Sequence, residues 1–178
     1  PEQIAEIVSI EGINSMKFTV FNREIINRTF ELCWDIDCRL FIGTGLLAYE
    51  GMKMGACGPF CPMCLIAPED MHQLFEHIKN KEWERAFEVQ EKIRAGGCAL
   101  FSGLTNIDYE TIKNGFMAIY NAPPSSPISH TRVAHHILKE ALRLKGVPIT
   151  NQVRLPYRSI TPKLSEWVKK LLSDFGWL

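Results

Sequence analysis

The 178-residue sequence predicts an α/β fold in which parallel βα units come first and a helical extension follows. Short apolar runs alternate with amphipathic helical patterns over about the first 80 residues. The second half carries helical patterns alone. Three β–helix units in succession imply parallel strands joined by right-handed crossovers. A doubly wound sheet and part of a barrel both accommodate such units.

The elements of the first half follow from the spacing of apolar side chains. The predicted strands are residues 12–18, 38–42 and 55–61, and the predicted helices are residues 2–9, 21–33, 46–54 and 68–78. Pro68 suits the first turn of the last of these helices, because an N–H at that position has no helical partner. Met71, Leu74, Phe75 and Ile78 then follow the i, i+3, i+4, i+7 rule. These patterns give the order of three βα units.

The second half contains three further helical patterns and a loop. The helices are expected around residues 83–93, 133–142 and 164–172. Residues 121–127 are rich in proline and serine and are expected to form a loop. The aromatic residues from Trp167 to Trp177 are interpreted as helix packing.

Composition and charge exclude several classes of partner. The chain has 20 basic and 20 acidic residues, which argues against nucleic acid or an anionic membrane. No apolar stretch approaches the ~20 residues that cross a bilayer, so no membrane association is expected. Six cysteines without a secretion signal favour free thiols in a reducing compartment, and therefore a cytoplasmic protein.

Lys17 interrupts the apolar run of the first predicted strand. Burial of an ammonium group is costly, and desolvation favours the neutral amine of a lysine, which is a carbonyl nucleophile able to form a Schiff base. The alternative places Lys17 on a solvent-facing side of the strand, with Met16 and Phe18 pointing inward. Lys17, the Gly43-Thr44 turn and Phe60 all fall near carboxyl ends of predicted strands, where such folds bind ligands.

Five short segments carry a family resemblance in their order and spacing. They are Met-Lys-Phe-Thr at 16–19, Ile-Gly-Thr-Gly at 42–45, Gly-Ala-Cys-Gly-Pro-Phe at 55–60, Ala-Pro-Glu-Asp-Met at 67–71 and Arg-Leu-Pro at 154–156. Together they resemble the dihydrodipicolinate synthase / N-acetylneuraminate lyase family of class I aldolases.

This resemblance implies an eight-stranded (β/α) barrel, or TIM barrel, of which the chain carries the C-terminal part. Residues 1–80 would be the last βα units, about three in number, and residues 81–178 a C-terminal helical extension that packs on the barrel. Lys17 would close strand six and form the Schiff base. The residues implied to line the pocket are Thr19, two positions after the lysine, Gly43 and Thr44 at the end of strand seven, and Phe60, an apolar residue of strand eight that packs on pyruvate.

The resemblance also implies the reaction and its partners. The enzyme would be a lyase, or aldolase, acting on pyruvate or another 2-oxo acid and on an aldehyde. Neither a cofactor nor a metal is expected. A homo-oligomer is expected, and the identity of the aldehyde is left open because specificity groups come from several loops.

Part of the family's active site has no counterpart ahead of Lys17. The family's proton-carrying tyrosine and its Gly-Thr-Thr-Gly-Glu-like carboxylate-binding loop lie upstream of the lysine, and only 16 residues precede Lys17 here. Tyr120 is followed by Asn-Ala-Pro, as in the family's tyrosine segment, but chain order makes this a chance match in a loop. We therefore expect either a partial chain of an aldolase or a truncated, non-catalytic homologue that assembles with itself or a relative.

A second chemistry is suggested by the cysteines of the third strand. Cys57, Cys61 and Cys64 have C-x3-C-x2-C spacing, which resembles the iron–sulfur ligand loop of radical S-adenosylmethionine enzymes. The alternative is three buried thiols beside an apolar strand. An iron–sulfur enzyme is therefore a further hypothesis.

Overall fold

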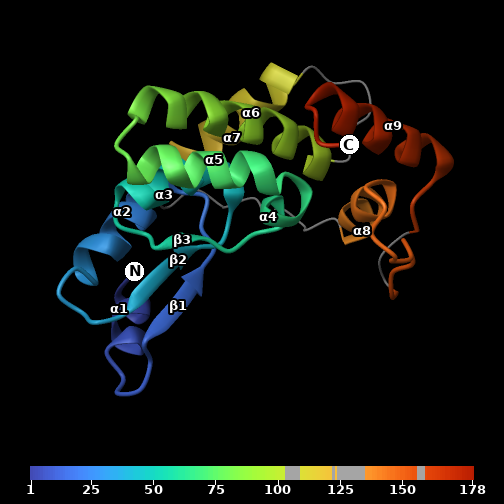
Figure 1. Ribbon diagram of the computed structural model, residues 1–178. Coiled ribbons are helices and arrows are strands. Elements are labelled where there is room, and N and C mark those ends of the chain that lie inside the picture. The colour runs from blue at the N-terminus through green and yellow to red at the C-terminus, as the bar shows by residue number, and fades with distance from the viewer. Residues whose placement is uncertain (103–108, 122, 124–134, 156–158) are drawn as a thin grey trace.

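The computed structural model describes residues 1–102, 109–121, 123, 135–155 and 159–178 (Figure 1). Within these residues, β1 (Ser15–Phe18), β2 (Arg39–Ile42) and β3 (Gly58–Pro59) form one parallel sheet in the order β1-β2-β3. The register sets Phe18 beside Ile42, and Ile42 beside Pro59. The prediction of three parallel βα units is confirmed, although each strand is shorter than its apolar run.

The described helices are α1 (Glu2–Val8), α2 (Arg23–Leu32), the 3-10 helix η1 (Gly45–Leu47), α3 (Ala48–Lys53), α4 (Met63–Ile66), α5 (Pro68–Lys79), α6 (Trp83–Ser102), α7 (Tyr109–Tyr120), α8 (His135–Leu144) and α9 (Pro162–Asp174). The predicted helices are all present among them, whereas α4 and α7 were not expected from the sequence. Val133 and most of the predicted loop at 121–127 lie outside the described residues.

Local capping explains where several helices begin. The Asn22 side chain accepts a hydrogen bond from the Ile25 N–H at 3.1 Å, and the Thr161 hydroxyl accepts one from the Leu164 N–H at 3.2 Å. Proline occupies the first turn of α5 and of α9, as expected at Pro68. The two capping hydrogen bonds satisfy backbone donors that the helices themselves leave unpaired, and a proline at the first turn has no such donor.

One face of the sheet is covered by helices and forms the first hydrophobic core. Phe18 and Ile42 from the strands pack with Ile26 and Phe30 of α2 in this core. Helix α3 approaches the sheet closely at Gly51, where an added Cβ would lie 3.0 Å from the Ile42 Cβ. The covered face is therefore fixed by helices that follow β1 and β2 directly in the chain.

A second hydrophobic core lies between α4, α5, α6, α8 and α9 (Figure 1). Trp177, which is 4% exposed, packs so closely on α6 that a Cβ at Gly96 would lie 2.3 Å from its ring. The Trp177 indole N–H donates to Asp70 at 2.6 Å, so this aromatic residue packs within the helical layer, as expected. Among the described helices none has both the length and the apolar character to span a membrane.

Candidate active site at the carboxyl ends of the strands

The uncovered face of the sheet gathers residues that are distant in the sequence. Side chains alternate across a strand, so Lys17 lies on the face opposite Phe18, and so does Thr19. Strand pairing continues past the ends of β1 and β2, since the Gly43 N–H donates to the Phe18 carbonyl at 2.7 Å and the Phe60 N–H to the Ile42 carbonyl at 2.9 Å. Gly43 and Phe60 therefore lie in the row beside Thr19. We call Lys17, Thr19, Gly43 and Phe60 the strand-end cluster.

Lys17 is exposed and lies over Phe60. The Lys17 Nζ is 5.6 Å from the centroid of the Phe60 ring, which is within the range of a cation–π contact. The expectation of a buried lysine is wrong for this structure. Met16 is half-buried and Phe18 is buried, so the alternative orientation, with the lysine on the open side, is the one observed. Lys17 stands on the face of the sheet opposite the core that contains Phe18, and this face is the exposed one.

Gly43 leaves space above β2 for the side chains of Lys17 and Thr19. A Cβ at this position would lie 1.8 Å from the Thr19 Oγ1, 2.8 Å from the Lys17 Cε and 2.9 Å from the Phe18 carbonyl oxygen. These distances are too short for any real side chain, and the carbonyl belongs to backbone held in the sheet. Glycine is therefore required for Lys17 and Thr19 to reach over β2.

Thr44 has a different role from the other predicted pocket residues. It is 6% exposed, and its hydroxyl accepts a hydrogen bond from the Leu46 N–H at 3.2 Å. This contact caps η1 and fixes the turn that follows β2. The structure brings Lys17, Thr19, Gly43 and Phe60 together and gives Thr44 the task of shaping the turn.

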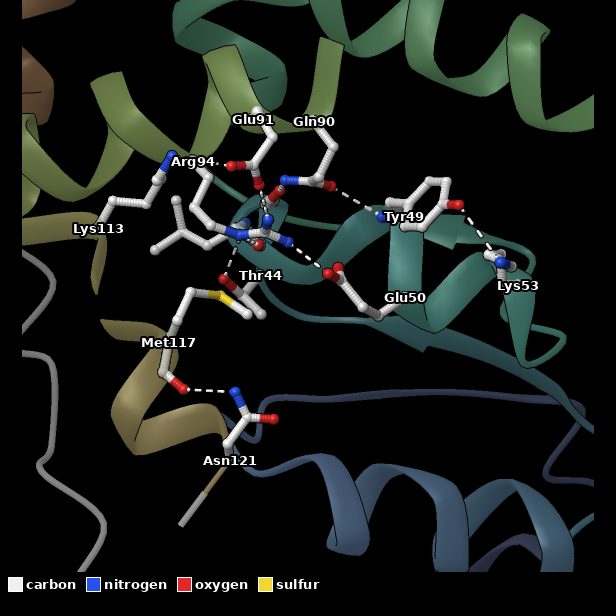
Figure 2. A network of polar contacts seen from close by, with 12 residues as sticks. Thr44, Tyr49, Glu50, Lys53, Gln90, Glu91, Arg94, Lys113, Met117 and Asn121 are labelled. Carbon is white, nitrogen blue, oxygen red and sulfur yellow. Dashed lines mark hydrogen bonds and ion pairs between the residues drawn. The ribbon is translucent and has the colours of Figure 1, made fainter. Parts of the chain in front are cut away.

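Two residues of α6, which sequence reasoning missed, hold the turn after β2 against this helix (Figure 2). The Gln90 amide donates to the Gly45 carbonyl at 3.0 Å and accepts from the Tyr49 N–H at 2.8 Å. The Arg94 Nε donates to the Leu46 carbonyl at 3.0 Å. Helix α6 therefore holds the backbone of η1, in the turn after β2, by two hydrogen bonds and the backbone of α3 by one.

Arg94 is a buried charge at the centre of an ion-pair network. Its side chain is 1% exposed and donates to Glu91 and to Glu50, and Lys113 donates to Glu91 at 2.9 Å (Figure 2). Burial raises the pKa of Glu50, and the neighbouring Arg94 opposes this shift. Two cations thus face two carboxylates, so the charge of Arg94 is compensated.

Tyr120 ends helix α7 on the covered side of the sheet. It is 4% exposed and belongs to the core that contains Phe18 and Ile42, and burial raises its pKa to about 12. The sequence analysis placed it in a loop, whereas the structure places it in a helix. It therefore lies in the core on the side of Phe18, away from the strand-end cluster, and its interpretation as a chance match stays a prediction.

The three cysteines of the proposed iron–sulfur loop do not come together. Cys61 and Cys64 lie side by side, with their sulfur atoms 3.7 Å apart, whereas Cys57 is exposed and interacts electrostatically with Cys38. Strand β3 separates Cys57 from Cys61. In the described part of the chain, no three side chains of the metal-binding kinds are grouped to hold an ion. The iron–sulfur prediction is therefore not supported.

The fold and the strand-end cluster define the class of protein. The structure is a partial (β/α) barrel with a helical layer, and it aligns with about half of complete barrel chains. The chain belongs to the dihydrodipicolinate synthetase family, whose family model matches residues 1–119.

Relatives of known sequence and structure agree with this assignment. The 4-hydroxy-tetrahydrodipicolinate synthase of Caldicellulosiruptor saccharolyticus is 24% identical over 176 residues, which are 99% of this chain and 49% of the relative. The dihydrodipicolinate synthase of Thermotoga maritima aligns with a TM-score of 0.71 at 21% identity, over 100% of this chain and 51% of that one. An N-acetylneuraminate lyase from Fusobacterium nucleatum, solved with pyruvate, aligns with a TM-score of 0.70 at 21% identity, over 98% and 48%. The chain therefore spans about half the length of the relatives it matches.

Proposed function

We propose that this chain carries the Schiff-base lysine of a class I aldolase, a lyase acting on pyruvate or another 2-oxo acid and on an aldehyde. The single observation that supports this most is the strand-end cluster: a lysine, a hydroxyl side chain, a glycine and an aromatic ring meet where three parallel strands end. Family membership adds to it, as does the pyruvate bound by the related lyase.

The proposed chemistry begins at the Lys17 nitrogen. The neutral amine attacks the ketone carbon, and loss of water leaves an iminium ion. The positive charge withdraws electrons from the adjacent carbon, which permits either cleavage of a carbon–carbon bond or addition to an aldehyde through the enamine. Thr19 lies beside the lysine on the open face and is suited to hydrogen-bond a substrate oxygen.

Phe60 has a positioning role in this proposal. Its ring is 67% exposed and faces the Lys17 side chain, so a small 2-oxo acid bonded to the lysine would rest against an apolar surface. A ring beside the methyl group of pyruvate excludes water from one side of the iminium. The free cysteines favour placing this reaction in the cytoplasm.

Hydrogen exchange tests the proposal. In heavy water, formation of the enamine exchanges the methyl hydrogens of pyruvate for deuterium, and NMR follows the loss of the methyl signal. The chain is expected to accelerate this exchange, and Lys17→Arg is expected to reduce the rate to the background. Lys53→Arg is the matched control, because Lys53 is an exposed lysine that lies over Tyr49 and Trp83, away from the cluster. Equal rates for the two variants would contradict the proposal.

A second candidate function is assembly without catalysis. Strands β1 and β3 are both edges of the described sheet, and Phe60 and Leu65, which follow β3 in the chain, are exposed. Open edges and exposed apolar side chains favour association with another copy or with a relative. Sedimentation of the wild type beside Phe60→Ser separates the candidates. A shift from oligomer to monomer, together with no Lys17-dependent exchange, would favour assembly alone.

A further inference from the structure

Cys61 and Cys64 stand apart from the chain's other thiols in their mutual geometry. They are the ends of a Cys-Pro-Met-Cys segment that leads from β3 into α4. Their sulfur atoms are 3.7 Å apart, and formation of a disulfide requires that they close to about 2.05 Å. Small side-chain rotations supply such a movement, since both residues sit on one short segment.

Both cysteines are partly exposed, and their sulfur atoms lie within hydrogen-bond distance of each other. Each cysteine is half-buried, and exposed Phe60 and Leu65 flank the pair. The hydrogen bond from Cys61 lowers the pKa of the Cys64 thiol to about 6, and the same bond raises the pKa of Cys61. This direction favours Cys64 as the attacking thiolate and Cys61 as the proton donor.

We propose that Cys61 and Cys64 form a redox-active dithiol that exchanges with low-molecular-weight disulfides of the glutathione class. The Cys64 thiolate attacks one sulfur of the small disulfide, the sulfur–sulfur bond breaks, and one thiolate leaves. Cys61 then loses its proton to solvent and attacks the Cys64 sulfur, which expels the second small thiolate. The two cysteines lose two electrons in total, and the small disulfide gains them.

The location of the dithiol gives it a structural connection to the strand-end cluster. Cys61 follows Phe60 directly, and its sulfur would lie 2.9 Å from a Cβ at Gly45, in the turn after β2. The dithiol therefore sits between the ends of β2 and β3. The proposed exchange is independent of the aldolase chemistry, because it uses neither Lys17 nor a 2-oxo acid.

Peptide mapping after equilibration with glutathione tests the dithiol. Trypsin releases residues 54–79 as one peptide, which contains Cys57, Cys61 and Cys64. In Cys57→Ser protein, oxidised glutathione is expected to convert this peptide to a form that lacks two hydrogen atoms and resists alkylation. Excess reduced glutathione is expected to restore both thiols. A peptide that keeps two free thiols at every ratio of oxidised to reduced glutathione would overturn the proposal.

A second pair of variants tests the order of attack. Cys61→Ser removes the resolving thiol and is expected to accumulate glutathione on Cys64. Cys64→Ser is expected to accumulate much less on Cys61, because Cys61 is the more deeply buried sulfur with the raised pKa. Accumulation on Cys61 and not on Cys64 would overturn the assigned order. The Cys57→Ser variant keeps both Cys61 and Cys64, so the glutathione experiment on this variant tests the proposal without the other two variants.

Discussion

The open face of the sheet and the helical layer that includes α6 differ in how they treat charge. On the open face, Lys17 is an exposed cation whose near neighbours are a glycine, a threonine and an aromatic ring. In the helical layer, Arg94 is buried and pairs with the carboxylates of Glu50 and Glu91. Glu140 is also buried there, and its carboxylate accepts hydrogen bonds from Arg143 and Asn151. Buried charges with matched partners rigidify a fold, whereas the Lys17 amine is exposed at the end of a strand and forms no ion pair with the described residues. We infer that the helical layer stabilises the fold and that the proposed chemistry takes place on the open face of the sheet.

The first test of this difference removes the buried cation, Arg94. Arg94→Met removes the cation that pairs with Glu50 and leaves Glu91 with Lys113 alone, so the free energy of unfolding is expected to fall by about 3–5 kcal/mol. Denaturant titration followed by circular dichroism measures the change. Arg28→Met is the matched control, since Arg28 is 53% exposed in its ion pairs, and no measurable loss of stability is expected there. Equal losses for the two variants would contradict the supporting role of the α6 network.

Glu140 tests the role of buried, partnered charges through the pH dependence of stability. This buried carboxylate accepts hydrogen bonds from Arg143, Asn151 and Ser165, and the bond from Arg143 is the main cause that lowers its pKa from 4.5 to about 2. A lowered pKa stabilises the fold fully above the ordinary value of 4.5, and the stabilisation is lost as pH falls toward 2. Glu140→Gln is expected to lose about 2 kcal/mol at neutral pH.

Thermal unfolding between pH 7 and pH 2 measures this effect. The difference between the wild type and Glu140→Gln is expected to shrink steadily as the pH falls below about 4.5. A difference that stays constant over this range would show that the carboxylate charge contributes nothing.

The last prediction concerns the open face, where the expected loss of stability is comparable to that of Glu140→Gln and the effect on reactivity is expected to be large. Gly43→Ala forces the backbone or the Lys17 and Thr19 side chains apart, at a cost of about 1–3 kcal/mol. Gly58→Ala is the matched control in the neighbouring strand, because a Cβ there meets nothing within 4 Å. The rate of Lys17-dependent exchange is expected to fall in the first variant and to persist in the second. Loss of exchange in both would remove the special role of Gly43.

Much of the fold could be predicted from the spacing of apolar residues, and the exceptions have physical reasons. The βα order followed from local periodicity, but β3 shrinks to Gly58–Pro59 because a proline cannot donate to the ladder. Helix α4 was missed because four residues are too few to show a helical period. The division of the chain near residue 80 stays a prediction.

The candidate site was predicted in part, because some of its features follow from local patterns and others depend on residues far away in the sequence. Lys17, Gly43 and Phe60 could be placed together because parallel strands end at one edge. The exposure of Lys17 could not be read locally, since it depends on what covers the sheet. Arg94 resembles a solvated helix residue in sequence, and only the following Ala95-Gly96-Gly97 run signals close packing.

The most direct test of the central claim is to trap the proposed Schiff base on Lys17. Borohydride reduction in the presence of pyruvate converts the imine to a stable secondary amine. Lys17 is the first trypsin site of the chain, so modification is expected to replace peptide 1–17 by peptide 1–23 with the added mass. Lactate, which has no ketone, is expected to give no adduct. Selective, pyruvate-dependent labelling of Lys17 is the predicted result; an unmodified Lys17, or equal labelling of exposed lysines such as Lys53, would contradict it.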